Sequence, residues 1–368
     1  MGARDNSRRG KLALPVSVII PTHHRPDLVV TAVRSALRQD FANLEVIVII
    51  DGDDRQTTQV LNAITDQRLR IIDLAIPVGA AEARNLGVHE AQGEWVAFLD
   101  DDDEWFPHKL SRQMVAARQS TALWPIISSR LLVRRSQGDS ISPLRSYSSK
   151  KPVSDYLFCR SSFQDGPHAL QTSTLLMRRE FMLSVPFRIN LKRHQDWDWV
   201  LRAERVPGAA IVVLEEPLAI YRAPDPGPNA RESLSRAHDW QFSMDWGSDM
   251  RGFFSAKAYS WFLATECASR AAKGHASVKT CVEIARRFFF EGCPTPRSAA
   301  ILAAFFALPS AWQKSARSCR REGPFASRQA AEKNSCPLWN GVVIWKPATT
   351  PAAISKKSAK SPLSSTAS

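Results

Sequence analysis

The sequence lacks the features that mark disulfide-rich, zinc-binding and membrane-spanning proteins. Only six of its 368 residues are cysteines, and no two of them form a CxxC pair. Neither a disulfide framework nor a zinc module is supported, and a reducing cytosol fits best. The basic N-terminus is not followed by the apolar segment of a signal peptide. No apolar run approaches the ~20 residues that span a bilayer, and the nearest, Ala299–Leu308, predicts a buried or an interfacial helix.

Net charge is absent from the first two thirds of the chain. Basic and acidic side chains are equal in number over residues 1–250, so the whole charge of +13 lies in residues 251–368. A basic C-terminal third favours an anionic partner, such as lipid headgroups or nucleic acid. A solvated tail without a specific partner is the alternative. The length and a hydrophobic content of 44% predict one large domain with a smaller addition.

The first 120 residues alternate between two kinds of segment. Four short, β-branched-rich segments show little polar alternation, which is typical of strands buried on both faces of a parallel sheet. They are Val16–Pro21, Leu44–Ile50, Leu69–Leu74 and Trp95–Leu99. The helical stretches between them are Pro26–Gln39, Gln56–Ile64 and Ala80–Ala91. This alternation predicts an α/β fold with a doubly wound sheet, in which ligands bind beyond the carboxyl ends of the strands.

The rest of the chain changes character more than once. Further predicted elements are strands at Ile126–Val133, Gln171–Met177 and Ile211–Leu214 and a helix at Trp197–Arg205. A Pro/Gly segment at residues 224–228 should then break regular structure. We expect a flexible N-terminus (1–14), an α/β domain (15–225), a helical region (226–315) and a basic, largely disordered tail (316–368).

The most informative segment is the run of five acids from Asp100 to Glu104, directly after the fourth predicted strand. Five like charges repel one another, which points to a cationic partner, and carboxylates are the ligands that Mg²⁺ and Mn²⁺ prefer. Asp100 and Asp102 point the same way in an extended chain. A solvated acidic turn is the alternative. Since Thr22 and Asp51 also follow predicted strands, we expect a metal-assisted nucleoside diphosphate site at this edge of the sheet.

Five segments, in this order, resemble the family 2 glycosyltransferases with the GT-A fold. They are VSVIIPTHHRPD (Val16–Asp27), VIIDGDD (Val48–Asp54), GAAEARNLGV (Gly79–Val88), GEWVAFLDDDDEWFPHKL (Gly93–Leu110) and HQDWDWVLR (His194–Arg202). The resemblance implies a GT-A nucleotide-diphospho-sugar transferase fold, which is Rossmann-like with a doubly wound mixed sheet. Residues 15–120 would form its nucleotide-binding half and residues 121–225 its acceptor half, followed by the helical extension and the tail.

The resemblance also implies roles for residues at the first two strand ends and in the third segment. Thr22 would contact the nucleotide base or ribose, and Asp51 would hydrogen-bond the base. The family's usual further Asp is replaced here by Ile50. Arg84 would meet the base or the diphosphate, for which a guanidinium fork is suited.

Within the acidic run, the resemblance implies a division of labour. Asp100 would lie near both the ribose and the metal, and Asp102 would bind the metal directly. Asp101 would flank them in the nucleotide-sugar site. The implied cofactor is a divalent metal, Mn²⁺ or Mg²⁺.

Asp196 is the residue to which the resemblance assigns catalysis. A sugar hydroxyl is a poor nucleophile, so a carboxylate must take its proton as it attacks the anomeric carbon. Gln195 stands where the family often has Glu, and Asp198 is a competitor for the role of base. A purely structural alternative for Asp196 is an N-cap of the helix Trp197–Arg205.

Other residues carry weaker implications. Trp105 is a candidate wall for the sugar, and Thr172, Ser173 and Thr174 would lie where a sugar binds or would be ordinary strand residues. Arg222 and His238 lie where the family often closes a lid over the diphosphate.

The function expected is that of an inverting, metal-dependent hexosyltransferase. It would use a UDP- or GDP-sugar donor and a glycan or lipid-linked acceptor in bacterial surface polysaccharide or glycolipid synthesis. The expected location is cytoplasmic, with peripheral association at the anionic inner face of the plasma membrane and no nucleic-acid partner. The alternatives are a metal-dependent nucleotide- or nucleic-acid-processing protein and a non-catalytic sugar-binding relative. Aromatic and basic residues do not interleave in residues 251–368 as a single-strand groove requires.

Overall fold

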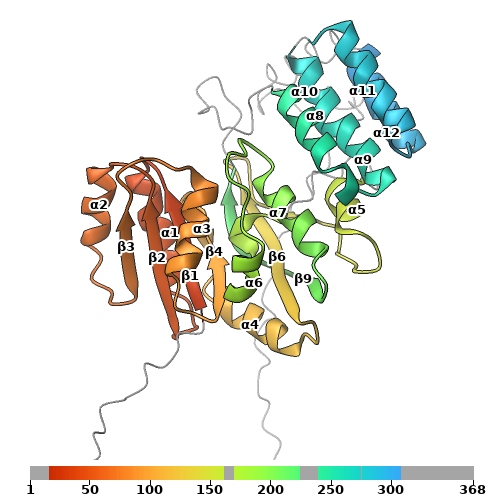
Figure 1. The fold of residues 1–368 in the computed structure, drawn as a ribbon. Coiled ribbons are helices and arrows are strands. Elements are labelled where there is room, and N and C mark those ends of the chain that lie inside the picture. The colour runs from red at the N-terminus through yellow and green to blue at the C-terminus, as the bar shows by residue number, and fades with distance from the viewer. Residues whose placement is uncertain (1–15, 161–169, 224–238, 275, 308–368) are drawn as a thin grey trace, which may run out of the picture.

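One mixed β-sheet forms the centre of the protein. The computed structural model describes residues 16–160, 170–223, 239–274 and 276–307. The strand order is β3-β2-β1-β4-β8-β6-β9-β5, with β7 paired to β6 (Figure 1). The strands are β1 (Val16–Thr22), β2 (Leu44–Ile50), β3 (Leu69–Asp73), β4 (Trp95–Phe98), β5 (Asp103–Trp105), β6 (Trp124–Arg134), β7 (Ser140–Ser142), β8 (Leu176–Arg178) and β9 (Ala209–Arg222).

Parallel pairing is confined to two parts of this sheet. In the first half of the chain β1 lies parallel to β2 and β4, and β2 lies parallel to β3. In the second half β6 and β9 are parallel, whereas β8 runs antiparallel to both β4 and β6. The sheet is therefore mixed, as the resemblance implies, and β8 joins its two halves.

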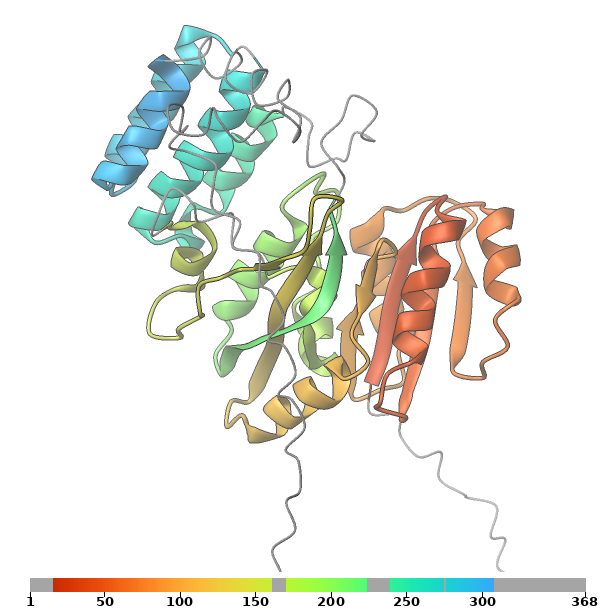
Figure 2. The same ribbon diagram turned by 180° about the vertical axis from the view of Figure 1, so that it is seen from behind.

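Helices cover both faces of the sheet. α1 and α4 lie on the face seen in Figure 2, and α3, α6 and α7 lie on the face seen in Figure 1. The helices of the sheet domain are α1 (Pro26–Leu37), α2 (Arg55–Asn62), α3 (Ala80–Glu90), α4 (Lys109–Gln119), α5 (Val153–Phe158), α6 (Arg179–Ser184) and α7 (Gln195–Glu204). All seven residues of β1 and of β2 are buried, because the side chains of each strand pack into two hydrophobic cores, one on each face of the sheet.

A helical unit follows the sheet domain. It consists of α8 (Trp240–Asp249), α9 (Ala256–Phe262), α10 (Ala268–Lys273), α11 (Val278–Phe290) and α12 (Pro296–Ala307). An aromatic cluster joins the unit to the sheet domain, since Phe158 at the end of α5 lies 4.9 Å from both Trp197 of α7 and Phe254. In the described part of the chain, no helix combines the length and hydropathy needed to cross a bilayer.

The strands predicted for the first half of the chain are confirmed. β2 has the predicted bounds, and β1, β3 and β4 each end one residue from the predicted end. The apolar runs of β1, β2 and β4 are fully buried, and such runs locate strands locally. The prediction that β3 is also buried on both faces is wrong, because β3 is at the edge of the sheet and each of its residues is half-buried or exposed.

Predictions for the second half are less accurate. The strand predicted at Gln171–Met177 is wrong over most of its length, because Thr172–Thr174 form a 3₁₀ turn and β8 begins only at Leu176. The helix predicted from Trp197 begins two residues earlier, at Gln195, and β9 extends well beyond the predicted Ile211–Leu214. The predicted N-terminus (1–14), Pro/Gly segment (224–228), His238 and tail (316–368) lie outside the described residues.

Candidate active site

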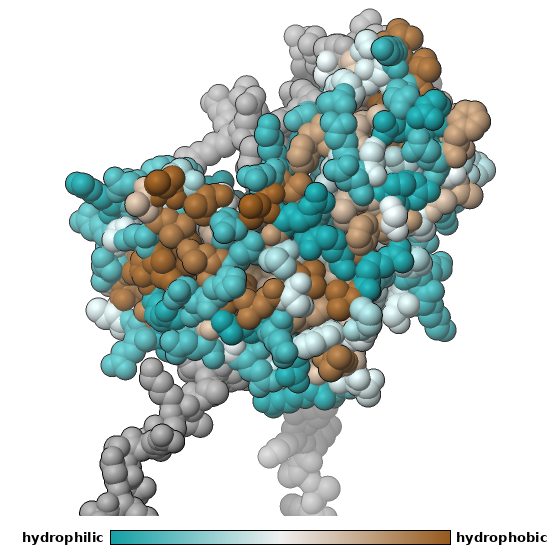
Figure 3. Space-filling view, in the orientation of Figure 1, coloured by the Kyte–Doolittle hydropathy of each residue, from teal (hydrophilic) through white to brown (hydrophobic). Residues whose placement is uncertain are grey.

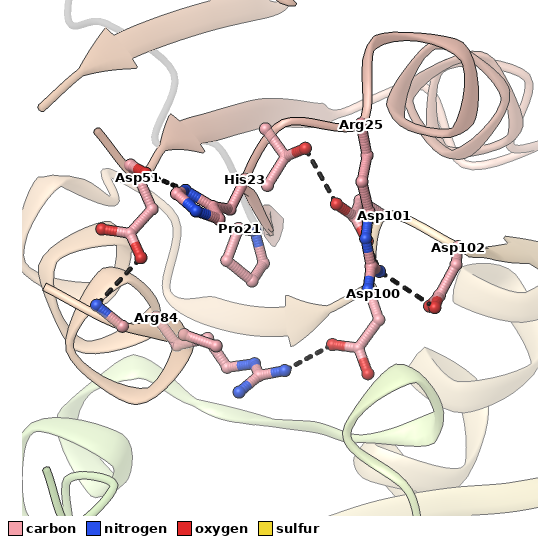
Figure 4. Close-up of a pocket in the computed structure, with 11 residues that line it drawn as sticks. Pro21, His23, Arg25, Asp51, Arg84, Asp100, Asp101 and Asp102 are labelled. Atoms are coloured by element: carbon pink, nitrogen blue, oxygen red, sulfur yellow. Dashed lines mark hydrogen bonds and ion pairs between the residues drawn. The ribbon is translucent and has the colours of Figure 1, made fainter. Parts of the chain in front are cut away.

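A pocket of about 400 Å³ opens at the carboxyl ends of β1, β2 and β4 (Figure 4). Six residues that the sequence singles out line it together, and these are Thr22, Asp51, Arg84, Asp100, Asp101 and Asp102. They meet because parallel strands end at the same edge of the sheet. The pocket is thus where the strand–helix alternation predicts a ligand site.

Arg25 holds the acidic run in place and is missed by the sequence analysis. Its Nη1 lies 2.8 Å from Asp101 Oδ1 and 3.1 Å from Asp102 Oδ2. Thr22 Oγ1 donates to the other oxygen of Asp101 at 2.8 Å. The available signal was a lone arginine in the loop after β1, at the edge where the acids gather, but its pairing depends on the three-dimensional arrangement.

Burial, and to a lesser degree the neighbouring carboxylates, raises the pKa of Asp101 and of Asp102. Burial raises the pKa of Asp101 to about 6, against the opposing effect of Arg25. Burial and the neighbouring Asp100 raise the pKa of Asp102. The run therefore carries negative charge that its arginine partners do not fully compensate, and an added cation would be favourable there.

Asp51 shapes the pocket by holding the start of α3. Its Oδ1 accepts from the backbone N–H of Val78 at 2.6 Å, and its Oδ2 accepts from that of Gly79 at 2.9 Å. Gly79 has φ of 89°, a conformation that glycine adopts without strain, and it precedes the first residue of α3. Asp51 thereby fixes the helix that carries Arg84.

Arg84 connects the acidic run with α7. Its Nη2 lies 2.6 Å from Asp100 Oδ1, and its Nη1 donates to Gln195 Oε1 at 3.0 Å. The guanidinium is buried, and Phe187 lies 5.6 Å from its centre. A single side chain therefore contacts both Asp100 of the acidic run and Gln195, the residue beside Asp196.

Asp196 lies in the first turn of α7 and does not cap the helix. The N-cap is His194, with φ of 63°, so the capping alternative for Asp196 is wrong. The hydroxyl of Thr172 donates to Asp196 Oδ1. Burial and Asp100 raise the pKa of Asp196, whereas Arg84 and Thr172 oppose this effect. Asp196 does not line the pocket itself and is linked to it through Arg84 and Gln195.

Asp198, the competing acid, has a structural environment. It is fully buried, and its oxygens accept from Arg188 at 3.1 Å and Arg202 at 2.8 Å. The indole Nε1 of Trp246 donates to it at 3.2 Å. The Asp198 carboxylate thus accepts hydrogen bonds from residues of α7, α8 and a loop, and it connects the helical unit to the sheet domain.

The acidic run fits a divalent cation that is shared with a ligand. Among the described residues, no group of three or more His, Cys, Asp or Glu side chains could hold a metal alone. Asp100 and Asp102, with side chains 32% and 43% exposed, each pair one oxygen with an arginine. The remaining oxygen of each is a hard donor, and both residues line the pocket. Two carboxylates completed by phosphate oxygens and water are the usual protein sites for Mg²⁺.

Three further predictions fare differently. Trp105 is buried, and its Nε1 donates to the Ser173 carbonyl at 2.8 Å, so the prediction of a sugar-facing wall is wrong. The residues Thr172–Thr174 are fully buried and are not exposed sugar contacts. Arg222 forms an ion pair with Glu104, while His238 lies outside the described residues.

Comparisons with known proteins identify a family profile and individual relatives that this chain resembles. Residues 17–172 match the sequence profile of glycosyl transferase family 2. Amylovoran biosynthesis glycosyltransferase AmsB of Erwinia amylovora is 25% identical over 281 residues, which cover 74% of this chain and 90% of AmsB. A second relative is UDP-Glc:alpha-D-GlcNAc-diphosphoundecaprenol beta-1,3-glucosyltransferase WfaP of Escherichia coli. It is 38% identical over 99 residues, or 27% of this chain and 39% of WfaP.

A solved structure shows the same fold. It is the mannosyltransferase PcManGT from Pyrobaculum calidifontis in complex with GDP-Man and Mn²⁺. The TM-score is 0.51 and the sequence identity 17%, over 83% of this chain and 82% of that one.

Proposed function

Because residues 17–172 match the profile of glycosyl transferase family 2, we propose that the chain is an inverting enzyme of this family, which moves a sugar from a nucleotide-sugar donor to a hydroxyl acceptor. The observation that carries the proposal is the span of Arg84. It contacts Asp100 in the pocket and Gln195, the neighbour of Asp196, on α7. This contact links the pocket proposed to bind the donor with the residue beside the proposed base, which supports the proposal.

In this mechanism the pocket receives the nucleoside diphosphate and Asp196 receives the proton. The acceptor oxygen attacks the anomeric carbon while Asp196 removes its hydroxyl proton, and the bond from that carbon to the diphosphate breaks. A divalent cation held by Asp100 and Asp102 would supply positive charge that stabilises the departing diphosphate. One direct displacement inverts the anomeric configuration.

Relatives guide the proposed donor and acceptor. WfaP is named for a UDP-glucose donor and a diphosphoundecaprenol-linked acceptor, and AmsB for amylovoran biosynthesis. We therefore propose a UDP- or GDP-sugar and a glycan or lipid-linked acceptor of bacterial surface polysaccharide. A metal-dependent nucleic-acid-processing protein would give no role to the contacts of Arg84 and Asp196.

The test is nucleoside diphosphate release from a panel of UDP- and GDP-sugars, with Mn²⁺, Mg²⁺ or chelator. Release with one donor class, dependent on the metal, supports the proposal. A parallel melting experiment should show stabilisation by UDP or GDP only when the metal is present. No release and no stabilisation with any nucleotide would overturn it.

The exposed face of α11 supports peripheral binding to an anionic membrane. Val278, Val282 and Phe289 recur at helical spacing along it, and with Phe290 each is more than half exposed. In Figure 3, apolar and hydrophilic residues lie side by side at the upper right of the molecule, where Figure 1 places α11. A helix with apolar residues on one face and basic residues nearby favours the surface of an anionic bilayer. The charge of +13 in residues 251–368 complements such a surface.

Vesicle flotation tests this part of the proposal. Truncation after residue 250 is unsuitable, because it removes Phe254 and Phe262 from the aromatic cluster around Phe158. The variant Phe290→Asp should instead lose binding to phosphatidylglycerol vesicles, whereas Leu123→Asp, at another exposed apolar residue, which lies in the sheet domain, should bind normally. If the wild-type protein does not float with phosphatidylglycerol vesicles, membrane association is contradicted.

A further inference from the structure

A fully buried 3₁₀ turn between the acidic run and Asp196 is formed by three consecutive hydroxyl residues, Thr172, Ser173 and Thr174. The backbone closes the turn locally, since Thr174 N–H donates to the Gln171 carbonyl at 2.9 Å. Each hydroxyl bonds in a different direction. Buried hydroxyls are normally paired, so their partners show what the turn holds together.

Ser173 anchors the turn to the acidic run. Its Oγ accepts from the backbone N–H of Asp100 at 3.0 Å and donates to Asp103 Oδ2 at 2.5 Å. Its carbonyl accepts from Trp105 Nε1 at 2.8 Å. Three hydrogen bonds thus connect Ser173 with Asp100 and Asp103 of the acidic run and with Trp105, which directly follows the run.

The opposite side of the turn is fixed by α4 and β6. Gln113 Nε2 donates to the Thr174 carbonyl at 2.7 Å, and Lys109 Nζ donates to Gln113 Oε1 at 2.6 Å. The Thr174 hydroxyl bonds Ser128 of β6 at 2.7 Å. Lys109 is fully buried and lies 3.9 Å from the ring of Trp105. Buried hydrogen bonds of this kind hold the parts that they join in one arrangement, although Asp103 Oδ1 and Gln171 Oε1 are buried without a hydrogen-bond partner.

Thr172 connects this hydrogen-bonded turn to Asp196. We infer that Thr172 is a positioning residue, whose hydroxyl orients the Asp196 carboxylate and leaves Oδ2 to receive the acceptor proton. The inference rests on the proposed function of Asp196 as base. Thr172 donates to Asp196 Oδ1, and the turn is anchored on Asp100, so the base is held relative to the donor-side acids. Misplacing a reacting group by about 1 Å can cost on the order of 10²-fold in rate.

Threonine variants that keep or remove the hydroxyl test the inference. Thr172→Val preserves the shape and should lower kcat about 10- to 100-fold with donor KM unchanged. Thr172→Ser retains the hydroxyl and should restore most of kcat. Thr174→Val is the matched control, since it removes an equally buried hydroxyl that bonds β6 and not the base. Its melting temperature should fall at least as far as that of Thr172→Val, but its kcat should fall much less, because the bond from the Thr172 hydroxyl to Asp196 stays in place.

A double variant separates a positioning role from a structural one. In the Asp196→Asn background, Thr172→Val should cause no further loss of kcat, because both changes act on one group. Additive losses, failure of Thr172→Ser to restore kcat, or an equal loss of kcat in Thr174→Val would overturn the inference while leaving the proposed function intact. A wild-type protein that releases no nucleoside diphosphate would overturn both.

Discussion

Replacing Asp196 with asparagine removes the proposed base with little change to its surroundings. The amide has nearly the same shape, and its oxygen can still accept from the Thr172 hydroxyl. The pocket residues Asp100, Asp101 and Asp102 are untouched, as is the Arg84–Asp100 ion pair. Donor binding should therefore persist while the proton has no acceptor.

The magnitude follows from the chemistry that is lost. A positioned general base contributes about 10²- to 10⁴-fold to the rate, which corresponds to about 3–5 kcal/mol of transition-state stabilisation. We expect kcat for sugar transfer to fall by that factor and donor KM to stay within about threefold. Steady-state release of nucleoside diphosphate with the identified donor and acceptor measures both.

The neighbouring acid provides the control. Asp198→Asn alters a fully buried carboxylate that pairs with Arg188 and Arg202, so it should destabilise the fold by about 3 kcal/mol. The folded fraction should nevertheless retain kcat. An Asp196→Asn enzyme within tenfold of wild type, or a loss of chemistry confined to Asp198→Asn, would refute the assignment of the base.

Three further predictions concern metal binding, packing and pH. Asp102→Asn should remove the Mn²⁺-dependent part of the melting-temperature rise with UDP or GDP, and an undiminished rise would argue against the metal role of Asp102. Gly87→Ala places a Cβ 2.4 Å from Ile19 Cγ2, so urea unfolding should show a loss of about 1–3 kcal/mol, whereas an unchanged midpoint would contradict the packing. Burial and two nearby arginines lower the pKa of His194 from 6.5 to about 3, so only the unfolded chain binds its proton between these values. Stability should therefore fall as pH drops through this window, and His194→Asn should show a shallower fall.

The first half of the fold is predictable because its information is local. Strands such as β1 and β2 are buried on both faces and consist of apolar, β-branched runs, whose identity depends little on distant residues. Since parallel strands end at one edge, the meeting of Thr22, Asp51 and Asp100 follows from the same pattern.

The turn at Thr172–Thr174 is not predictable in this way. Threonine favours strands, and the segment lies beside genuine strand residues, so local preference predicts a continuous strand. The turn instead depends on partners far along the chain, with Ser173 bonding Asp103 across 70 positions. The contacts of Arg25 with Asp101 and Asp102 are equally non-local, across 76 and 77 positions. Such hydrogen bonds exist only once the sheet is assembled.

The anomeric configuration of the product tests the central claim most directly. Transfer from an α-linked nucleotide sugar would be followed by proton NMR of the isolated product, in which the anomeric coupling distinguishes the two configurations. A single displacement by a hydroxyl that Asp196 activates predicts a β-linked product. An α-linked product would contradict the account, because retention of configuration requires a different chemistry from the one proposed for this site.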